Sequence, residues 1–334
     1  MAIVHLTTQG AKATLDNGRL VVTAPEGTPR RLPIAQVTVL VVWGNITLTT
    51  PLMGALVDKG IEIIFLTRYG RFRGRLHGND TPHVLLRRAQ YTAQSNTEWV
   101  FRTAQGIVRA KLQHQRSLLQ RYTRRREGVP SAVKLAIAHL QSALAATERK
   151  QTLNALRGIE GTAARTYFSG IGALFQPRCR FRGRRRRPPS DPVNVLLSLG
   201  YTLLTQKAHS AAQAVGLDPY VGFLHAQEYG RPALALDLME EFRPVVDGLV
   251  LKLCNQGLIT PEDFTLGPPE RPCVLQEDGL RRFLQHFETR FSQRYLHPIR
   301  NERLPLQQCL VEQAYQLARR LREDKPGYRG MGFR

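Results

Sequence analysis

The sequence has few acidic residues, few cysteines and no long hydrophobic run. Its 334 residues include 26 Asp and Glu against 48 Lys and Arg, for a formal net charge of +22. The four cysteines form no C-x-x-C pair, which argues against a zinc ribbon or a disulfide framework. No apolar run approaches the ~18 residues of a membrane span, and the first residues lack the layout of a signal peptide. We therefore expect a soluble cytoplasmic protein with no membrane partner.

The sign of the charge indicates the kind of partner. A surplus made mostly of arginine fits a polyanion, because guanidinium groups match phosphate oxygens and each neutralised phosphate releases counterions. Nucleic acid is the leading candidate. Residues 1–85 hold nine Lys or Arg and five Asp or Glu, a surplus of four, which leaves +18 for the remaining 249 residues. The polyanion is therefore expected to bind mainly to the second part of the chain.

The chain divides into two regions of different pattern. Up to about residue 85, short apolar runs alternate with turn signals, among them Asn17-Gly18, a strong hairpin signal. One helical piece, stopped by Gly60, interrupts them. Beyond this point, long stretches have the 3.6-residue period of helices. This order predicts an α+β fold with segregated domains and no parallel α/β sheet. We predict a small N-terminal β-rich domain over residues 1–85, a larger all-helical domain over residues 86–324 and a mobile basic tail over residues 325–334.

Several common catalytic motifs are missing. The sequence has no G-x-x-x-x-G-K-[ST] loop, no G-x-G-x-x-G after a strand and no G-x-S-x-G elbow, so NTPase, dehydrogenase and α/β-hydrolase functions lose their support. Carboxylate and histidine chemistry remains. Glu160 lies between Gly158 and Gly161 in a helical pattern, where each glycine costs about 0.5–1 kcal/mol relative to alanine. Close approach of a backbone or ligand would explain the glycines. The alternative is a surface carboxylate paired with Arg157 or Arg165.

A second group of polar residues lies in GFLHAQEYGRPALALDLMEEFRP, which contains His225, Asp237, Glu240 and Arg243. On a helix, Asp237 and Glu240 project from one face. A histidine with carboxylates suits Mn²⁺ or Mg²⁺ better than zinc, which thiolates would favour. However, D-x-x-E before an apolar run is also a capping-box pattern with Asp237 as the N-cap, and a lone histidine is often a hydrogen-bonded core residue. Local spacing leaves both interpretations open.

Arginine is most concentrated between residues 178 and 187, where seven of ten residues are arginine. Such a run is either a flexible charged loop or a segment that contacts phosphates. The charge of the whole chain favours phosphate contact, which supplies affinity and not sequence readout. The predicted contacts are Arg178, Arg180, Arg182, Arg184, Arg185, Arg186 and Arg187.

Three blocks of sequence, in a fixed order, resemble a known family. They are R-G-x-E-G-x-A-A-R-x-Y-F around Glu160, D-P-x-N-x-L-L-x-x-G-Y around Asn194, and G-F-L-H followed by D-L-M-E-E-F-R-P around His225 and Glu240. This wording resembles the core CRISPR-associated integrase, the first of the universal Cas proteins, which captures new spacers. The resemblance extends over nearly all of the chain apart from the tail.

The resemblance implies a dimerising N-terminal domain, a helical metal-dependent catalytic domain over residues 86–324, and homodimers that join a second small CRISPR-associated adaptation protein. In this family a glutamate, a histidine and an acidic residue hold Mg²⁺ or Mn²⁺. Glu160, His225 and Glu240 match these ligands, and Asp237 occupies a nearby acidic position of the same catalytic site. Many members have aspartate where this chain has Glu240. The resemblance further implies Arg165, Tyr167 and Arg243 as DNA contacts.

The implied reaction is the attack of a spacer 3′-hydroxyl on a phosphodiester of the repeat in double-stranded DNA. This transesterification needs no ATP. A metal ion would neutralise the charge that grows on the phosphate and activate the hydroxyl. Two alternatives remain. A nucleic-acid-binding module without catalysis would need the charge alone, and a metal-dependent RNA-processing nuclease would differ from the integrase only in its substrate.

Overall fold

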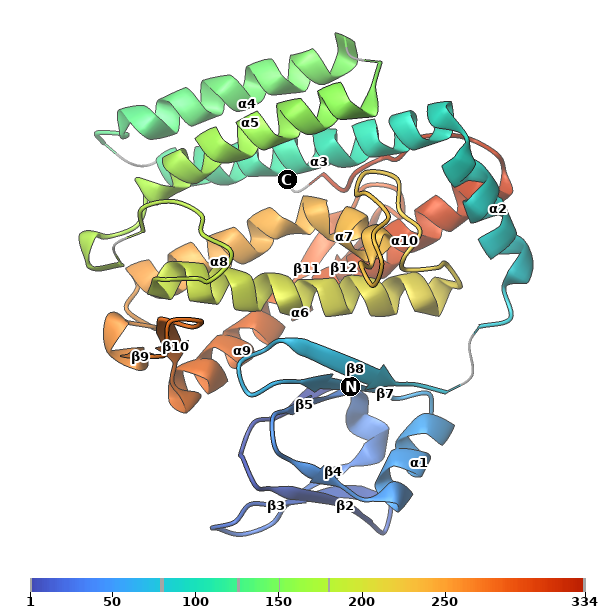
Figure 1. Ribbon diagram of the computed structural model, residues 1–334, viewed down its shortest axis with the longest axis vertical. Coiled ribbons are helices and arrows are strands. Elements are labelled where there is room, and N and C mark those ends of the chain that lie inside the picture. Colours follow the sequence, from blue (N-terminus) through green and yellow to red (C-terminus); the bar gives the residue numbers. More distant parts are fainter. Residues whose placement is uncertain (1, 79–80, 125–126, 150, 180, 333–334) are drawn as a thin grey trace. The chain divides into compact units, whose positions relative to one another are not determined.

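The computed structural model describes the chain except residues 1, 79–80, 125–126, 150, 180 and 333–334. Two compact units are present, one formed by Met1–Asp80 and Val274–Glu288 and the other by Thr81–Cys273 and Thr289–Arg334. The α+β class is confirmed, because strands dominate the N-terminal unit and helices dominate the larger unit (Figure 1). No helix in the described parts of the chain is long and apolar enough to cross a membrane.

Two four-stranded sheets make up most of the smaller unit, with strand orders β1-β5-β7-β8 and β4-β3-β2-β6. The predicted hairpin is confirmed, because Asn17 and Gly18 join two antiparallel strands and both have positive φ, as a type I′ turn requires. The strands are β1 (Ala2–Leu6), β2 (Lys12–Asp16), β3 (Arg19–Thr23), β4 (Arg30–Pro33), β5 (Val37–Trp43), β6 (Thr47–Leu48), β7 (Glu62–Leu66) and β8 (Phe72–Leu76).

Helix α1 (Thr50–Asp58) gives this unit a feature that the order of strands and helices did not predict. Strand β5 pairs parallel with both β1 and β7, so this sheet contains parallel neighbours, although the chain as a whole keeps the predicted α+β class. Parallel neighbours need a crossover connection, and α1 supplies it between β5 and β7. Its buried Leu52 and Leu56 pack in one core with Leu40 and Ile63. Gly60, at φ +67°, follows the end of the helix as predicted.

Long helices form the larger unit. Helices α3, α4 and α5 pack side by side, and α6 packs against α7, α8 and α10 (Figure 1). The helices are α2 (Val84–Ser95), α3 (Thr97–Thr123), α4 (Ser131–Arg149), α5 (Leu153–Gly172), α6 (Pro192–Val215), α7 (Ala233–Met239), α8 (Arg243–Asn255) and α10 (Leu306–Arg322). A 3-10 turn, η3 (Glu240–Phe242), links α7 to α8, and α9 (Glu277–Ser292) begins in the smaller unit and ends in the larger one.

Two details correct the predicted helical domain. The stretch expected to be helical from about residue 85 breaks at Asn96, whose side chain accepts hydrogen bonds from the backbone N–H groups of Glu98 and Trp99 and so caps α3. The domain is also not all-helical. Strand β11 (Arg294–His297) pairs antiparallel with β12 (Glu302–Pro305) inside it, and β9 (Phe264–Leu266) with β10 (Cys273–Leu275) forms another two-stranded sheet.

The C-terminal segment packs against α3, where the sequence predicted a mobile tail over residues 325–334. Tyr328 and Met331 are buried, and the segment runs beside α3 (Figure 1). Gly106 permits this approach, because a Cβ at that position would lie 2.1 Å from the carbonyl oxygen of Tyr328. The last two residues of the predicted tail, 333–334, lie outside the described part of the chain.

We predict that Gly106→Ala lowers the free energy of unfolding by about 1–3 kcal/mol, the usual cost of overpacking a filled site. The matched control is Gly158→Ala on α5, where a Cβ would meet nothing within 4 Å and the loss of a helical glycine should add about 0.5–1 kcal/mol. Chemical denaturation of both variants measures the difference. Equal effects of the two substitutions would contradict the packing of the tail on Gly106.

Candidate active site in the helical domain

A buried lysine lies between two carboxylates from distant parts of the chain. Lys111 extends from α3, Glu160 from α5 and Glu240 from η3. The Lys111 Nζ donates a hydrogen bond to Oε1 of Glu160 and lies 2.5 Å from Oε2 of Glu240. The side chains of Lys111 and Glu240 are 8% and 4% exposed, against 26% for Glu160. Since a buried charge needs a partner, these three residues depend on one another.

Arg243 completes the charge balance of this cluster. Its Nε donates to Oε1 of Glu240 at 2.7 Å. Burial alone would raise the pKa of Glu240, but the positive charges of Arg243 and Lys111 outweigh it and hold that pKa well below its usual value. Burial also opposes the charge of Lys111, yet Glu240 and Glu160 keep its pKa above the usual value. Glu240 and Lys111 therefore stay charged at neutral pH.

Asp237, near the end of α7, fixes His225. Its Oδ1 accepts hydrogen bonds from the His225 ring Nδ1 at 2.7 Å and from the His225 backbone N–H at 3.0 Å, while Oδ2 accepts from the N–H groups of Phe223 and Leu224 at 2.6 and 2.9 Å. With Nδ1 engaged, Nε2 lies 3.7 Å from Oε1 of Glu240. Asp237 lies inside α7 and not at its N-cap, so the capping-box alternative is wrong.

The helix that carries Glu160 also holds the loop of His225. Arg157 donates from Nε and one terminal nitrogen to the carbonyl of Leu224, at 2.9 and 2.6 Å. Glu160 itself pairs with Lys111, so the alternative of a surface carboxylate paired with Arg157 or Arg165 is wrong. A Cβ at Gly158 or Gly161 would meet nothing within 4 Å. No protein backbone therefore packs on these two glycines, and no other part of the described chain covers the helix surface beside Glu160.

The structure thus brings the four predicted catalytic residues, Glu160, His225, Asp237 and Glu240, into one cluster. In the described parts of the chain, no three acidic, histidine or cysteine side chains are grouped so that they could hold a metal ion as they stand; the Lys111 ammonium lies between the two carboxylates. The donor set still fits a hard divalent ion, since it offers two carboxylates and an imidazole oriented by a third. In addition, Oε2 of Glu240 is buried without a well-aligned hydrogen bond.

Another buried carboxylate, Asp247 on α8, lies next to the cluster and binds two tyrosines. The hydroxyl of Tyr167 donates to Oδ2 at 2.7 Å and that of Tyr201 to Oδ1 at 2.5 Å. The Arg243 guanidinium carbon lies 4.6 Å from the centroid of the Tyr201 ring, so this arrangement also positions Arg243. Tyr167 is 0% exposed, which contradicts its predicted contact with DNA. Arg243 lies between Tyr201 and Glu240 and stays a predicted contact.

Two arginines of the run from residue 178 to 187 have structural roles. Arg178 donates to the carbonyls of Cys254 and Asn255, both at 3.0 Å, at the end of α8. Arg184 donates to Oδ1 of Asn194 at 2.8 Å, and its guanidinium carbon lies 5.4 Å from the centroid of the Tyr201 ring. Their hydrogen bonds therefore serve the fold, a role that the predicted phosphate contact did not include.

Other arginines of the run are open to solvent. Arg182, Arg185, Arg186 and Arg187 are exposed, as is Arg165 on α5. These five residues stay predicted phosphate contacts, as does Arg178, which is also exposed. Arg180, which belongs to the same prediction, lies outside the described residues.

Sequence reasoning missed Lys111 and Asp247. Both stand in apolar helical patterns, Lys111 four residues after the buried Ile107 and seven before the buried Leu118. Charged residues are almost never buried unless they are paired. A lysine at that position of the stripe was therefore a signal for a buried acidic partner, although it could not say which one.

Known proteins resemble this chain over its length. The sequence model of the family described as CRISPR associated protein Cas1 matches residues 4–289. A protein from Rhodospirillum rubrum named CRISPR-associated endonuclease Cas1 2 is 40% identical over 336 residues, which covers 97% of this chain and 96% of the relative. One from Thermus thermophilus named CRISPR-associated endonuclease Cas1 1 is 39% identical over 315 residues and covers 94% of each.

Solved structures share the fold. A CAS1 protein from Thermotoga maritima matches with a TM-score of 0.82 and 25% identity over 100% of both chains. A chain of a Cas6-RT-Cas1–Cas2 complex matches with a TM-score of 0.82 and 25% identity over 97% of this chain and 35% of that chain. A casposase bound to integration product has a TM-score of 0.85 at 21% identity, over 98% and 93% of the two chains, and this last likeness concerns the fold.

We predict that the stability of the protein depends on the protonation of Asp247. Burial, largest among the causes, raises the pKa of Asp247 to about 6 from an ordinary 3.8, against the hydrogen bonds from Tyr201 and Tyr167 and the charges of Arg243 and Arg184. A raised pKa means that the folded state binds the proton more tightly. This contribution to stability is therefore full below the unfolded pKa and is lost as the pH rises through about 6.

Asp247→Asn removes this titration and keeps the shape of the side chain. From about pH 4 to pH 7, the free energy of unfolding of the variant relative to the unmodified protein should rise by roughly 2–3 kcal/mol. Urea denaturation of both proteins at several pH values in this range measures it. A constant difference between the two proteins would show that Asp247 titrates normally.

Proposed function

The chain belongs to the CRISPR-associated Cas1 family of endonucleases, and on that premise we propose that it is a metal-dependent DNA integrase of CRISPR adaptation. The proposed reaction joins the 3′-hydroxyl ends of spacer DNA to the CRISPR repeat by transesterification. The observation that carries the proposal is the convergence of three separate segments: Glu160 and Glu240 both pair with the buried Lys111, and His225 Nε2 lies 3.7 Å from Oε1 of Glu240.

The residues of the cluster have complementary tasks in this proposal. Asp237 holds His225 through Nδ1, which leaves Nε2 free to act as a neutral ligand. Arg243 and Lys111 keep Glu240 ionised, as a ligand must be. Mg²⁺ or Mn²⁺ held by Glu160, His225 and Glu240 supplies charge neutralisation at the attacked phosphate and activation of the hydroxyl. Lys111, which lies between the two carboxylates, would supply a further positive charge near the phosphate oxygens, which carry the growing negative charge.

Exposed arginines and the uncovered surface of α5 form the proposed DNA-binding region. Arg165 lies on the same helix as Glu160, and Arg182, Arg185, Arg186 and Arg187 belong to the loop before α6. Their phosphate contacts give affinity that falls with salt and does not depend on sequence. Because no side chain extends from Gly158 and Gly161, a DNA backbone approaches α5 beside Glu160 without a clash.

The proposal also includes partners. We infer a homodimer that uses the N-terminal β-rich unit and associates with a second, small CRISPR-associated protein. The support is that a chain of the same fold occurs in a Cas6-RT-Cas1–Cas2 complex.

A protein that bound nucleic acid without catalysis would need the arginines alone, and the pairing of Lys111 with both carboxylates suits that alternative. An RNA-processing nuclease would use the same site on another substrate.

The first test compares strand joining by the unmodified protein and by His225→Ala. The assay contains the small CRISPR partner, Mn²⁺ or Mg²⁺, a short duplex with free 3′-hydroxyls and a supercoiled plasmid that carries the repeat. Loss of a metal ligand should lower the joining rate at least about 100-fold, with DNA affinity unchanged. His139→Ala is the matched control, since His139 lies on α4 and binds Thr166, away from the cluster.

Four outcomes decide between the functions, the last of them from the same assay with an RNA substrate added. Joining that depends on metal and disappears only in His225→Ala supports the integrase. Equal joining by His225→Ala and His139→Ala would show that His225 does not belong to the catalytic site. Binding of DNA without joining or cutting by any of the proteins supports the non-catalytic alternative, and preference for an RNA substrate supports the nuclease.

The second test measures metal binding without DNA. Electron paramagnetic resonance of free Mn²⁺ should detect binding to the unmodified protein, and Glu160→Gln should weaken that binding more than about tenfold. Glu127→Gln, at an exposed carboxylate of the same domain, is the matched control. Lys111→Met should strengthen Mn²⁺ binding, because the ammonium competes for the same carboxylates. Equal affinities of all four proteins would exclude a metal at this cluster.

A further inference from the structure

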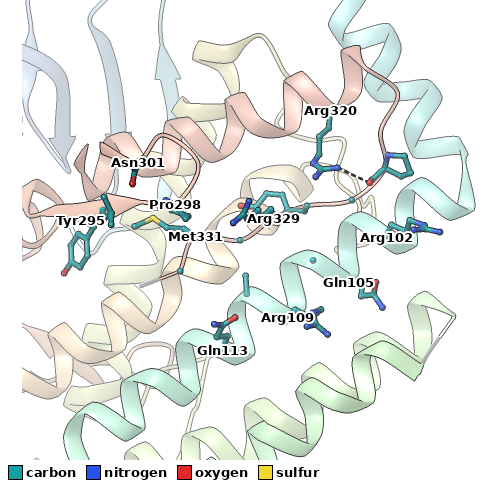
Figure 2. A pocket seen from close by; sticks show the side chains of 18 residues that line it. Arg102, Gln105, Arg109, Gln113, Tyr295, Pro298, Asn301, Arg320, Arg329 and Met331 are labelled. Carbon is teal, nitrogen blue, oxygen red and sulfur yellow. Dashed lines mark hydrogen bonds between the residues drawn. The ribbon is translucent and has the colours of Figure 1, made fainter. Parts of the chain in front are cut away.

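A second site of the helical domain lies on another face of α3. There, a pocket of about 830 Å³ is bounded by α3, the strand β11, the end of α10 and the C-terminal segment (Figure 2). We call it the arginine pocket. Lys111, Glu160, His225 and Glu240 do not line it. Its volume falls within the range of about 300–1,000 Å³ that ligand sites have. The proposed reaction does not account for this pocket.

The lining of the arginine pocket is strongly positive. Arg102, Arg109, Arg320 and Arg329 line it, and none of the described lining residues is acidic (Figure 2). Arg102 and Arg109 pair with Glu98 and Glu148 at 2.9 and 2.7 Å, but all four side chains of these pairs are at least 40% exposed. Exposed ion pairs contribute little, so a phosphate easily competes for these guanidinium groups.

The neutral residues of the lining include groups that can bind nucleobases. Tyr295 on β11 lies at one end of the pocket, where the guanidinium carbon of Arg290 lies 5.3 Å from the centroid of its ring, and the exposed Gln113 on α3 offers an amide (Figure 2). Arginine forks bind phosphates, aromatic rings stack on bases, and amides bond to base edges. A duplex keeps its bases stacked inside and cannot enter a hollow, whereas an unpaired strand can turn bases into it.

The C-terminal segment that lines the pocket is fixed by hydrogen bonds and close packing. Tyr328 and the N–H of Met331 donate to the buried carboxylate of Glu241, to which Gln313 also donates at 2.6 Å. A Cβ at Gly330 would lie 2.2 Å from the Cβ of Ala110 on α3. The C-terminal segment is therefore fixed against α3, and the arginine pocket does not depend on a ligand for its shape.

We propose that the arginine pocket binds an unpaired segment of a nucleic-acid strand, with phosphates on the arginines and a base on Tyr295. The site is distinct from the metal cluster and requires no step of the proposed reaction. An acidic protein segment would match the charge and could bond to the amide, but its carboxylates would not stack on the tyrosine ring. The observations therefore favour nucleic acid over an acidic peptide.

The test is fluorescence anisotropy in the presence of a chelator, with a single-stranded oligonucleotide of about 12 nucleotides and a blunt duplex as probes. Arg102→Gln with Arg329→Gln should weaken binding of the single strand about tenfold and lower its salt slope by about 1.4, or ~0.7 for each lost phosphate contact. The duplex should bind as before. The matched control removes the same charge outside the pocket, at the exposed Arg88 and Arg319, as Arg88→Gln with Arg319→Gln.

Tyr295→Leu separates stacking from charge. It keeps every arginine, and it should also weaken binding of the single strand about tenfold while leaving a poly-glutamate peptide unaffected. The proposal is overturned if the pocket pair weakens single strand and duplex equally, or no more than the control pair does. It is also overturned if the pocket variants lose only the poly-glutamate peptide. Because no metal and no joining are involved, these outcomes leave the proposed integrase function untouched.

Discussion

The buried ammonium of Lys111 is the constraint on which the helical domain depends. It extends from α3 to one carboxylate on α5 and another on η3, so three segments must meet at one point. With Arg243, these side chains are two cations and two anions. Removing Glu240 would leave Arg243 without its carboxylate and Lys111 with only one, and breaking a buried pair in this way costs about 3–5 kcal/mol. The packing of α3 with α5 and of α7 with α8 therefore has to be compatible with this cluster.

The neighbours Glu240 and Glu241 show how one short turn serves two parts of the domain. Glu240 pairs with Lys111 and Arg243, whereas Glu241 binds Tyr328, Gln313 and the N–H of Met331. Burial raises the pKa of Glu241 to about 7, although these three donors oppose the shift. The turn is a 3-10 helix, which directs the two adjacent side chains to different surroundings. The C-terminal segment thereby restrains the turn that carries Glu240.

The sequence predicted the parts that local chemistry decides. The Asn17-Gly18 hairpin and the Gly60 stop follow from φ preferences, and the grouping of Glu160, His225, Asp237 and Glu240 followed from motif wording. Lys111 and Asp247 were missed because their partners lie far away in the sequence, and only the packed helices decide which charges meet. For the same reason, Tyr167 was assigned to DNA although it packs on Asp247, and Arg178 and Arg184 were not recognised as structural residues.

The balance of charge inside the cluster explains how a site rich in carboxylates accepts a polyanion. Glu160 and Glu240 alone would repel a phosphate, but Lys111 and Arg243 cancel them, and the rest of the helical region carries most of the +22 surplus. In the proposed reaction, a divalent ion in place of one ammonium would make the cluster one unit of charge more positive when a phosphate has to bind. The surplus of arginine and the four acidic or histidine side chains thus belong to one electrostatic arrangement, in which the surface attracts the strand and the cluster acts on it.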